Sequence, residues 1–129
     1  MLERYASDGV GAFGYTFGWE SPYRDGFLGS CHTIELPFIF GTYADPAVEP
    51  YAGAGTRADA VAANTQRAWT TLAASGAPRL PSGDWPSIGG VGRPVAILGD
   101  APRLQTDEER QELRIWDELQ SAVKPTAIC

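Results

Sequence analysis

Four aromatic residues near the start of the chain alternate with small residues, and this pattern restricts the fold more than any other. The segment 12–19 carries an aromatic side chain at every second position: Phe13, Tyr15, Phe17 and Trp19. A period of two predicts a β-strand whose large side chains all share one face. The opposite face carries only Gly14, Thr16 and Gly18, so another backbone or a helix can approach it closely. An isolated edge hairpin would have no need of so bare a face.

The segment 56–75 shows the clearest helical pattern in the chain. Thr56 and Asp59 form a weakened capping box at its start, and Gly76 is typical of a residue that ends a helix. Five apolar residues form a stripe at helical spacing: Ala58, Val61, Ala68, Trp69 and Leu72. We expect this stripe, including Trp69, to pack in the core.

Shorter elements are predicted around this helix. The apolar run 34–40 is broken by Pro37, which favours a short turn of helix or an irregular buried segment over a central strand. Residues 94–98 predict a short strand, which a turn directs back toward residues 103–105. The long Gly- and Pro-rich loop before this strand contains Trp85, which we expect to anchor the loop on the body of the protein.

The last predicted element is a helix that begins at Thr106. Thr106 and Glu109 form a capping box, and the acidic pair Asp107 and Glu108 suits the positive end of the helix dipole. Pro125 ends the pattern. Four apolar residues form the stripe that we expect to be buried: Leu113, Trp116, Leu119 and Val123.

Length and charge exclude several classes of protein. The 129 residues suit one domain and leave no room for a second, and no internal repeat divides them. Ten basic and sixteen acidic residues give a net charge of -6, the wrong sign for a protein that neutralises phosphates, so we expect no nucleic-acid partner. No apolar run approaches the roughly 20 residues of a membrane span. The first residues lack the basic-then-apolar order of a secretory signal, and the compartment stays open.

The chain lacks the residue patterns typical of metal and cofactor sites. Zinc needs three or four ligands at short spacings, whereas here one histidine accompanies Cys31 and Cys129, which lie far apart. The glycine cluster 89–92 leads into Pro94 and a short strand, not into the helix of a phosphate-binding loop. We therefore expect no metal, no cofactor and no structural disulfide.

His32 is the first residue to test for chemistry, because a general base near neutral pH is most often a histidine. It is the single histidine of the chain and lies in a loop between two apolar segments. On position alone, an ordinary surface histidine is the simpler interpretation. The adjacent Cys31 does not supply a thiol–imidazole pair, because neighbours in an extended backbone point to opposite faces.

The residues around His32 nevertheless form a recognisable motif. The pattern Gly29-x-x-His32-x-x-Glu35, followed by Leu-Pro-Phe-x-Phe-Gly over 36–41, closely resembles the histidine segment of type-B carboxylesterases, the family of para-nitrobenzyl esterases and cholinesterases. Further blocks resemble the same family in the same order: the aromatic strand 15–19, residues 68–69 with 75–78, and the loop 84–86. Together they cover about residues 12 to 116. Three positions depart from the family pattern: Leu72, Ala77 and Arg79.

The resemblance implies a fold and a role for each motif residue. It implies the C-terminal portion of an α/β-hydrolase fold over residues 1–129, with few strands, two main helices and long loops, incomplete as a domain. His32 would be the general base of a serine, histidine and acid triad acting on a small-molecule ester. Glu35 would support the loop through hydrogen bonds, and Phe38 and Phe40 would pack near the pocket floor.

The resemblance also implies that other parts of the enzyme lie elsewhere. In α/β-hydrolases the serine, on a G-x-S-x-G turn, and the acid precede the histidine in chain order. No G-x-S-x-G occurs in these 129 residues, so both residues would lie upstream of Met1, in an N-terminal part of the fold that would be the partner of this segment. Alone, the chain should be inactive and expose apolar surface. The alternatives are a non-catalytic module of the same descent that folds alone or docks on a partner, and a small unrelated α+β binding domain.

Overall fold

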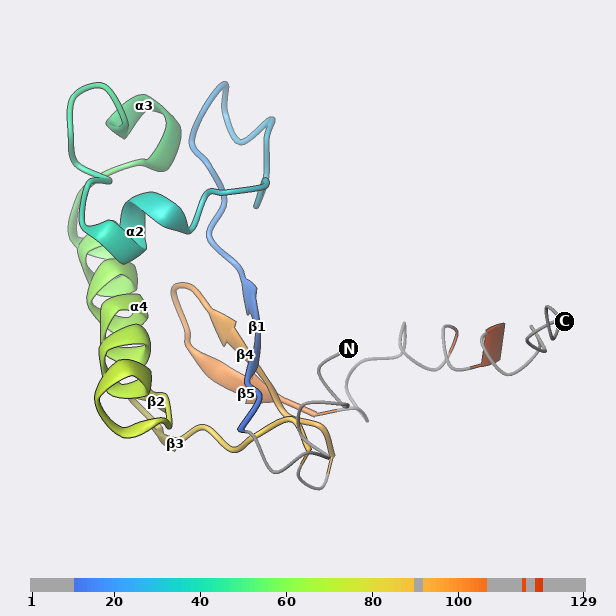
Figure 1. Ribbon diagram of the computed structural model, residues 1–129. Helices are drawn as coiled ribbons and strands as arrows, with labels where there is room; N and C mark the ends of the chain where they lie inside the picture. The colour runs from blue at the N-terminus through green and yellow to red at the C-terminus, as the bar shows by residue number, and fades with distance from the viewer. Residues whose placement is uncertain (1–10, 90–91, 107–114, 116–117, 120–129) are drawn as a thin grey trace, which may run out of the picture.

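The computed structural model describes residues 11–89, 92–106, 115 and 118–119 (Figure 1). In this part of the chain one strand is followed by three helices and then by four short strands, an α/β arrangement. In chain order they are β1 (Gly14–Phe17), α2 (Leu36–Phe40), α3 (Glu49–Ala52), α4 (Thr56–Ser75), β2 (Arg79–Leu80), β3 (Gly83–Asp84), β4 (Val95–Leu98) and β5 (Arg103–Gln105). The described residues include no helix that is both long and apolar enough to cross a bilayer.

The predicted aromatic strand is confirmed as β1, which lies at one edge of a three-stranded sheet ordered β1-β4-β5. β1 runs parallel to β4, with Gly14 opposite Val95, and β4 pairs antiparallel with β5. Both predicted strands after residue 93 are therefore confirmed. Beyond the paired residues, a Cβ on Gly99 would lie only 3.3 Å from the backbone carbon of Gly18. This approach lies within the sheet. On the bare face itself Thr16 and Gly18 are exposed, so the predicted approach of another element to that face stays a prediction.

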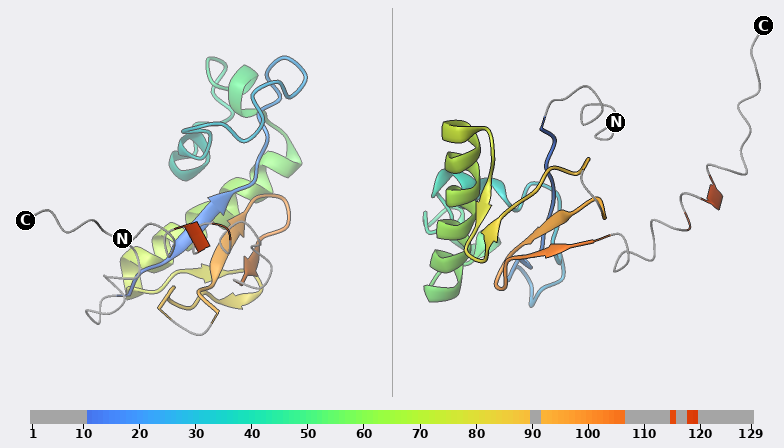
Figure 2. Two further views of the ribbon diagram at one scale, coloured as in Figure 1. Left: turned by 90° about the vertical axis from the view of Figure 1, so that its right-hand side faces the viewer. Right: turned by 90° about the horizontal axis from the view of Figure 1, so that it is seen from below.

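The long helix α4 lies along one side of this sheet (Figure 2). It ends, as predicted, at Gly76, which has a left-handed φ of 74° and donates its N–H to the carbonyl of Leu72 at 2.8 Å. The expected capping box at its start is wrong. Gly55 is the N-cap, no side chain caps the first turn, and Asp59 instead accepts a hydrogen bond from the Tyr43 hydroxyl at 2.7 Å.

The stripe of α4 is only partly buried. Its buried residues recur at helical spacing: Ala58, Val61, Ala62, Thr65 and Ala68. Trp69 remains 40% exposed, so the expectation that it lies in the core is wrong. The small side chains let α4 approach its neighbours closely, whereas the large indole lies at the margin of this contact, edge-on to Tyr15 with ring centroids 6.1 Å apart.

The core is an aromatic cluster centred on Phe38 of α2, the short helical turn that the sequence predicts. Phe38 is fully buried. Its ring centroid lies 5.5 Å from that of Phe17, 5.3 Å from that of Trp19 and 5.3 Å from that of Tyr43, which stacks on it. Trp19 is buried, and its indole N–H donates to the carbonyl of Ala52 at 2.7 Å. The cluster thus joins β1, α2 and α3.

The loop after α4 is held down at Trp85, which is 5% exposed and lies edge-on to Phe13. The predicted anchoring role of Trp85 is therefore confirmed. The short antiparallel hairpin of β2 and β3, which precedes it, is not predicted by the sequence pattern.

The final predicted helix lies largely outside the described residues, as do Leu113, Trp116 and Val123 of its stripe. Leu119 is described and is 51% exposed, so its expected burial is wrong. Helical spacing predicts a stripe, but the stripe is buried only where a second element packs on it.

Candidate active site

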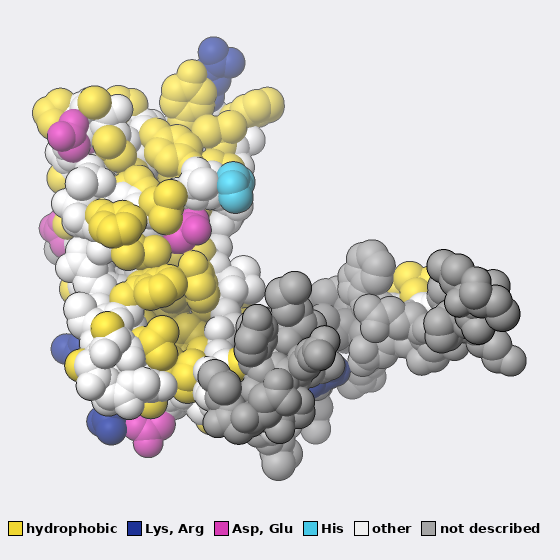
Figure 3. All heavy atoms as spheres, in the orientation of Figure 1, with side chains coloured by type: hydrophobic (Ala, Val, Ile, Leu, Met, Phe, Trp, Pro, Cys, Tyr) yellow, Lys and Arg dark blue, Asp and Glu magenta, His cyan; other side chains and the backbone are white. Residues whose placement is uncertain are grey.

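His32 lies in the loop that leads from the carboxyl end of β1 toward α2. Its side chain is exposed, and Figure 3 shows the single histidine at the surface of the face drawn there. No described side chain forms a hydrogen bond or an ion pair with the imidazole. The imidazole is therefore available to a group that reaches it from outside the described residues.

The start of this loop is fastened to the end of β1. The backbone N–H of Ser21 donates to the carbonyl of Gly29 at 2.9 Å, and the Ser30 hydroxyl donates to the carbonyl of Phe17 at 2.5 Å. Gly29 has a left-handed φ of 55°, a conformation that glycine adopts without strain. These contacts place the histidine beside the last residues of the strand.

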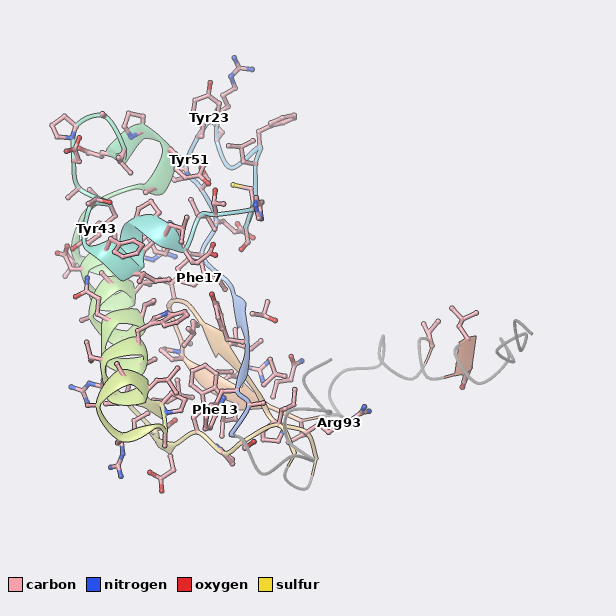
Figure 4. The ribbon with its side chains drawn as sticks, in the orientation of Figure 1. Phe13, Phe17, Tyr23, Tyr43, Tyr51 and Arg93 are labelled. Atoms are coloured by element: carbon pink, nitrogen blue, oxygen red, sulfur yellow. The ribbon has the colours of Figure 1, made fainter. Side chains whose placement is uncertain are left out.

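The centre of the loop is held by side-chain hydroxyls. The Thr33 hydroxyl donates to the carbonyl of His32 at 2.6 Å, and the Tyr51 hydroxyl of α3 donates to the same oxygen at 3.2 Å. The Tyr51 oxygen also lies 3.3 Å from Cys31 Sγ. Figure 4 shows Tyr51 between α3 and this loop. Cys31 is a free thiol that contacts Tyr51 and does not pair with the imidazole.

An open hollow surrounds the histidine. It is lined by residues 30–35 and, from β1, by Tyr15 and Phe17. Burial, and then the negative charge of Glu35, raises the pKa of the Tyr15 phenol above its ordinary value. The Glu35 carboxylate makes no hydrogen bond or ion pair with any described residue, so a supporting role for it stays a prediction. Its backbone carbonyl accepts bonds from the N–H groups of Phe38 and Ile39 at 3.1 and 3.0 Å.

The two predicted pocket aromatics differ in burial. Phe38 is buried in the core, whereas Phe40, two residues later on the same helix, is 75% exposed. Phe27, just before the histidine loop, is 81% exposed. Large exposed aromatic side chains on both flanks of His32 leave an apolar surface that a further part of a protein could cover.

The sequence pattern does not identify the residues that hold the loop. Ser21, Ser30 and Thr33 are isolated hydroxyl residues, and Tyr51 lies in a stretch rich in Ala, Gly and Pro without a periodic signal. Their contacts join segments that are up to 30 residues apart, as in the bond from Ser21 Oγ to the Tyr51 carbonyl. Among the described residues, no group of three His, Cys, Asp or Glu side chains is placed to hold a metal ion.

A strand parallel to its neighbour, a histidine loop at its carboxyl end and a covering helix together define a portion of an α/β enzyme fold. No protein-family model matches the chain. The para-nitrobenzyl esterase of Bacillus subtilis is 30% identical over 105 residues, which cover 77% of this chain and 21% of that protein. The chain thus spans about a fifth of the length of this relative.

Solved structures agree with this relationship. The carboxylesterase EST55 of Geobacillus stearothermophilus has a TM-score of 0.71 at 26% identity, over 89% of this chain and 24% of its own. A para-nitrobenzyl esterase structure has a TM-score of 0.62 at 30% identity, over 77% and 21% of the two chains. An esterase from Clostridium hathewayi, at 19% identity and a TM-score of 0.74, shares the fold. The chain is therefore a relative of the carboxylesterases, and its fold is a portion of their α/β-hydrolase domain.

Proposed function

We propose that the chain is the C-terminal segment of a serine carboxylic-ester hydrolase and that His32 is its general base. The imidazole would take the proton from a serine hydroxyl as that oxygen attacks the ester carbonyl, and would return it to the departing alcohol. A water molecule would then be activated in the same way to release the acid. The serine, the acid of the triad and the oxyanion donors would come from the other part of the fold.

The observation that carries this proposal is the placement of His32. The loop backbone is fixed by the hydrogen bonds at Ser30, Thr33 and Tyr51, whereas the imidazole itself is exposed and unpaired among the described residues. A histidine kept only for structure would be expected to use its ring nitrogens within its own fold. A fixed backbone with a free ring is what a base needs when its partners come from another segment.

The open edge of β1 supports an assembly with further strands. Gly18 turns its backbone toward β4, where its N–H donates to the carbonyl of Leu98 at 2.6 Å. Backbone groups alternate in direction along a parallel strand, so Phe13 and Tyr15 turn theirs outward, where no described strand pairs with them. An unpaired, aromatic edge strand is prone to pair with another strand. We propose that the remainder of the hydrolase sheet attaches there.

The direct test grafts this chain onto the rest of a relative. In the Bacillus subtilis para-nitrobenzyl esterase, the matched segment would be replaced by this chain, and hydrolysis of a short-chain nitrophenyl ester would be measured. We expect activity that falls about 10⁴-fold or more in His32→Ala and is unchanged in the exposed-site control Glu20→Ala. An active chimera that tolerates His32→Ala would contradict the proposal.

The isolated chain supplies the complementary test. With no nucleophile elbow in its sequence, it should neither hydrolyse the ester nor react with a serine-directed fluorophosphonate probe. Stoichiometric labelling of the purified chain would show a nucleophile within these residues. It would refute the proposal that this chain supplies the histidine while another part of the fold supplies the serine.

A second candidate function is a non-catalytic module that folds by itself. It is favoured by the closed aromatic cluster around Phe38, which is complete within the described residues. A monodisperse monomer with a cooperative unfolding transition would favour this candidate, whereas association that the remaining part of the hydrolase suppresses would favour the segment.

A further inference from the structure

We propose that Tyr51 is the positioning residue of the histidine loop: its hydroxyl ties α3 to the backbone at His32 and so fixes the point from which the imidazole projects. The importance of Tyr51 for catalysis rests on the proposed role of His32 as the general base. The structural claim itself concerns the loop alone and can be tested without an ester.

The Tyr51 hydroxyl is the centre of a short chain of hydrogen bonds. A hydroxyl has one proton, and here it is donated to the His32 carbonyl, 3.2 Å away. The contact of 3.3 Å with Cys31 Sγ must then run the other way, with the thiol donating to the phenol oxygen. The single side chain therefore contacts two consecutive loop residues, and both are about 20 positions away in sequence.

The base of Tyr51 is fixed as well as its tip. The Ser21 hydroxyl, which is fully buried, donates to the Tyr51 carbonyl at 2.6 Å. The backbone N–H of the same serine donates to Gly29, at the start of the histidine loop. Ser21 and Tyr51 thus connect α3 to the loop at both ends, and the phenol has little freedom to leave the His32 carbonyl.

Because Thr33 also donates to the His32 carbonyl, the need of this oxygen for a hydrogen bond can be separated from the positioning of the loop. The Thr33 hydroxyl donates to the His32 carbonyl at 2.6 Å, so that oxygen keeps a partner when the Tyr51 hydroxyl is removed. Thr33 moves with the loop, however, since it is the next residue, and its left-handed φ of 70° is unfavourable for a β-branched side chain. Among the residues that the structure describes, Tyr51 alone connects this turn to another element through the His32 carbonyl.

The protonation state suits this role. Burial raises the pKa of the Tyr51 phenol above its ordinary value. The phenol therefore remains a proton donor at neutral pH.

The experiment compares Tyr51→Phe with Tyr43→Phe in the full 129-residue chain. Each substitution removes one hydroxyl that makes a side-chain hydrogen bond, but Tyr43 bonds to Asp59 of α4 and not to the loop. Amide hydrogen exchange would be followed at Ile34, whose N–H donates to the Cys31 carbonyl at 3.2 Å within the loop, and along α4. The thiol reaction rate of Cys31 would be measured in a Cys129→Ser background.

We expect Tyr51→Phe to raise exchange at Ile34 and the reaction rate of Cys31 by about fivefold, the factor that corresponds to one ordinary net hydrogen bond. Tyr43→Phe should leave both unchanged. Equal rates in the two variants would overturn the proposal. A uniform rise that includes α4 would also overturn it, because Tyr51 would then serve general stability only. Neither readout depends on hydrolysis, so failure of the proposed triad role would be recognised separately in the chimera.

Discussion

Replacing Phe38 by alanine should destabilise the chain far more than the same change at Phe40. Both phenylalanines belong to the five-residue helix α2, yet Phe38 is 0% exposed and Phe40 is 75% exposed. Truncation of a buried phenylalanine costs about 3–5 kcal/mol through lost transfer energy and the cavity left behind. Three aromatic neighbours have ring centroids within 5.5 Å of that of Phe38, and we expect a loss of about 4 kcal/mol, in the middle of this range. Phe40→Ala should change the free energy of unfolding by less than about 0.5 kcal/mol.

Urea denaturation followed by tryptophan fluorescence measures both values, since Trp19 lies in the cluster. With a slope of about 2 kcal/mol per molar urea, the loss at Phe38 lowers the midpoint by about 2 M, which is large enough to leave a marginal protein unfolded in water. Phe40→Ala serves as the matched control because it has the same chemistry and the same helix. Comparable losses at the two positions would refute the assignment of Phe38 as the centre of the core and of Phe40 as an exposed side chain outside it.

Three further outcomes are expected from the described contacts. The hydrogen bond to Asp59 raises the pKa of Tyr43 above its ordinary value of 10.0. The stabilising effect of this bond is therefore present below that pH and is lost as the pH rises through the folded-state pKa. In urea titrations, the loss of unfolding free energy caused by Tyr43→Phe should shrink above about pH 10. Arg57→Ala should lower the urea midpoint more than Asp100→Ala, because Arg57 pairs with Asp100 and also lies over the Trp19 ring at 5.4 Å; equal midpoints would argue against the ring contact. Gly76→Ala should cost about 1 kcal/mol in thermal unfolding, since φ is 74° there, and Gly76→Asn should cost less because asparagine tolerates this conformation.

The secondary structure follows from local pattern wherever the pattern is long or strongly alternating. The aromatic alternation in β1 and the stop at Gly76 depend on the period of two and on the conformational freedom of glycine, and both are properties of short segments. The capping prediction at Thr56 is wrong because a local motif does not exclude other hydrogen-bond partners. A capping box is one of several ways to begin a helix, and here Asp59 bonds to Tyr43, 16 residues earlier, instead of to the first turn.

Burial is predicted less well than secondary structure. Trp69 and Leu119 have the spacing of core residues but remain 40% and 51% exposed. Whether a helical stripe is covered depends on what packs against it, and the chain spans only 21% of the Bacillus subtilis esterase and 24% of EST55. A pattern that is correct for a larger fold can therefore leave apolar residues uncovered in a portion of it.

By itself the sequence indicated the resemblance to carboxylesterases and the residue to test. The spacing of Gly29, His32 and Glu35 before an apolar helix is a local feature, and relatives with 26–30% identity confirm the carboxylesterase resemblance. Only the tertiary structure decided how the histidine is held, because Ser21 and Tyr51 act through single hydrogen bonds between segments far apart in the chain. Such contacts leave no period and no motif in the sequence, since they depend on how β1, α3 and the histidine loop meet in space.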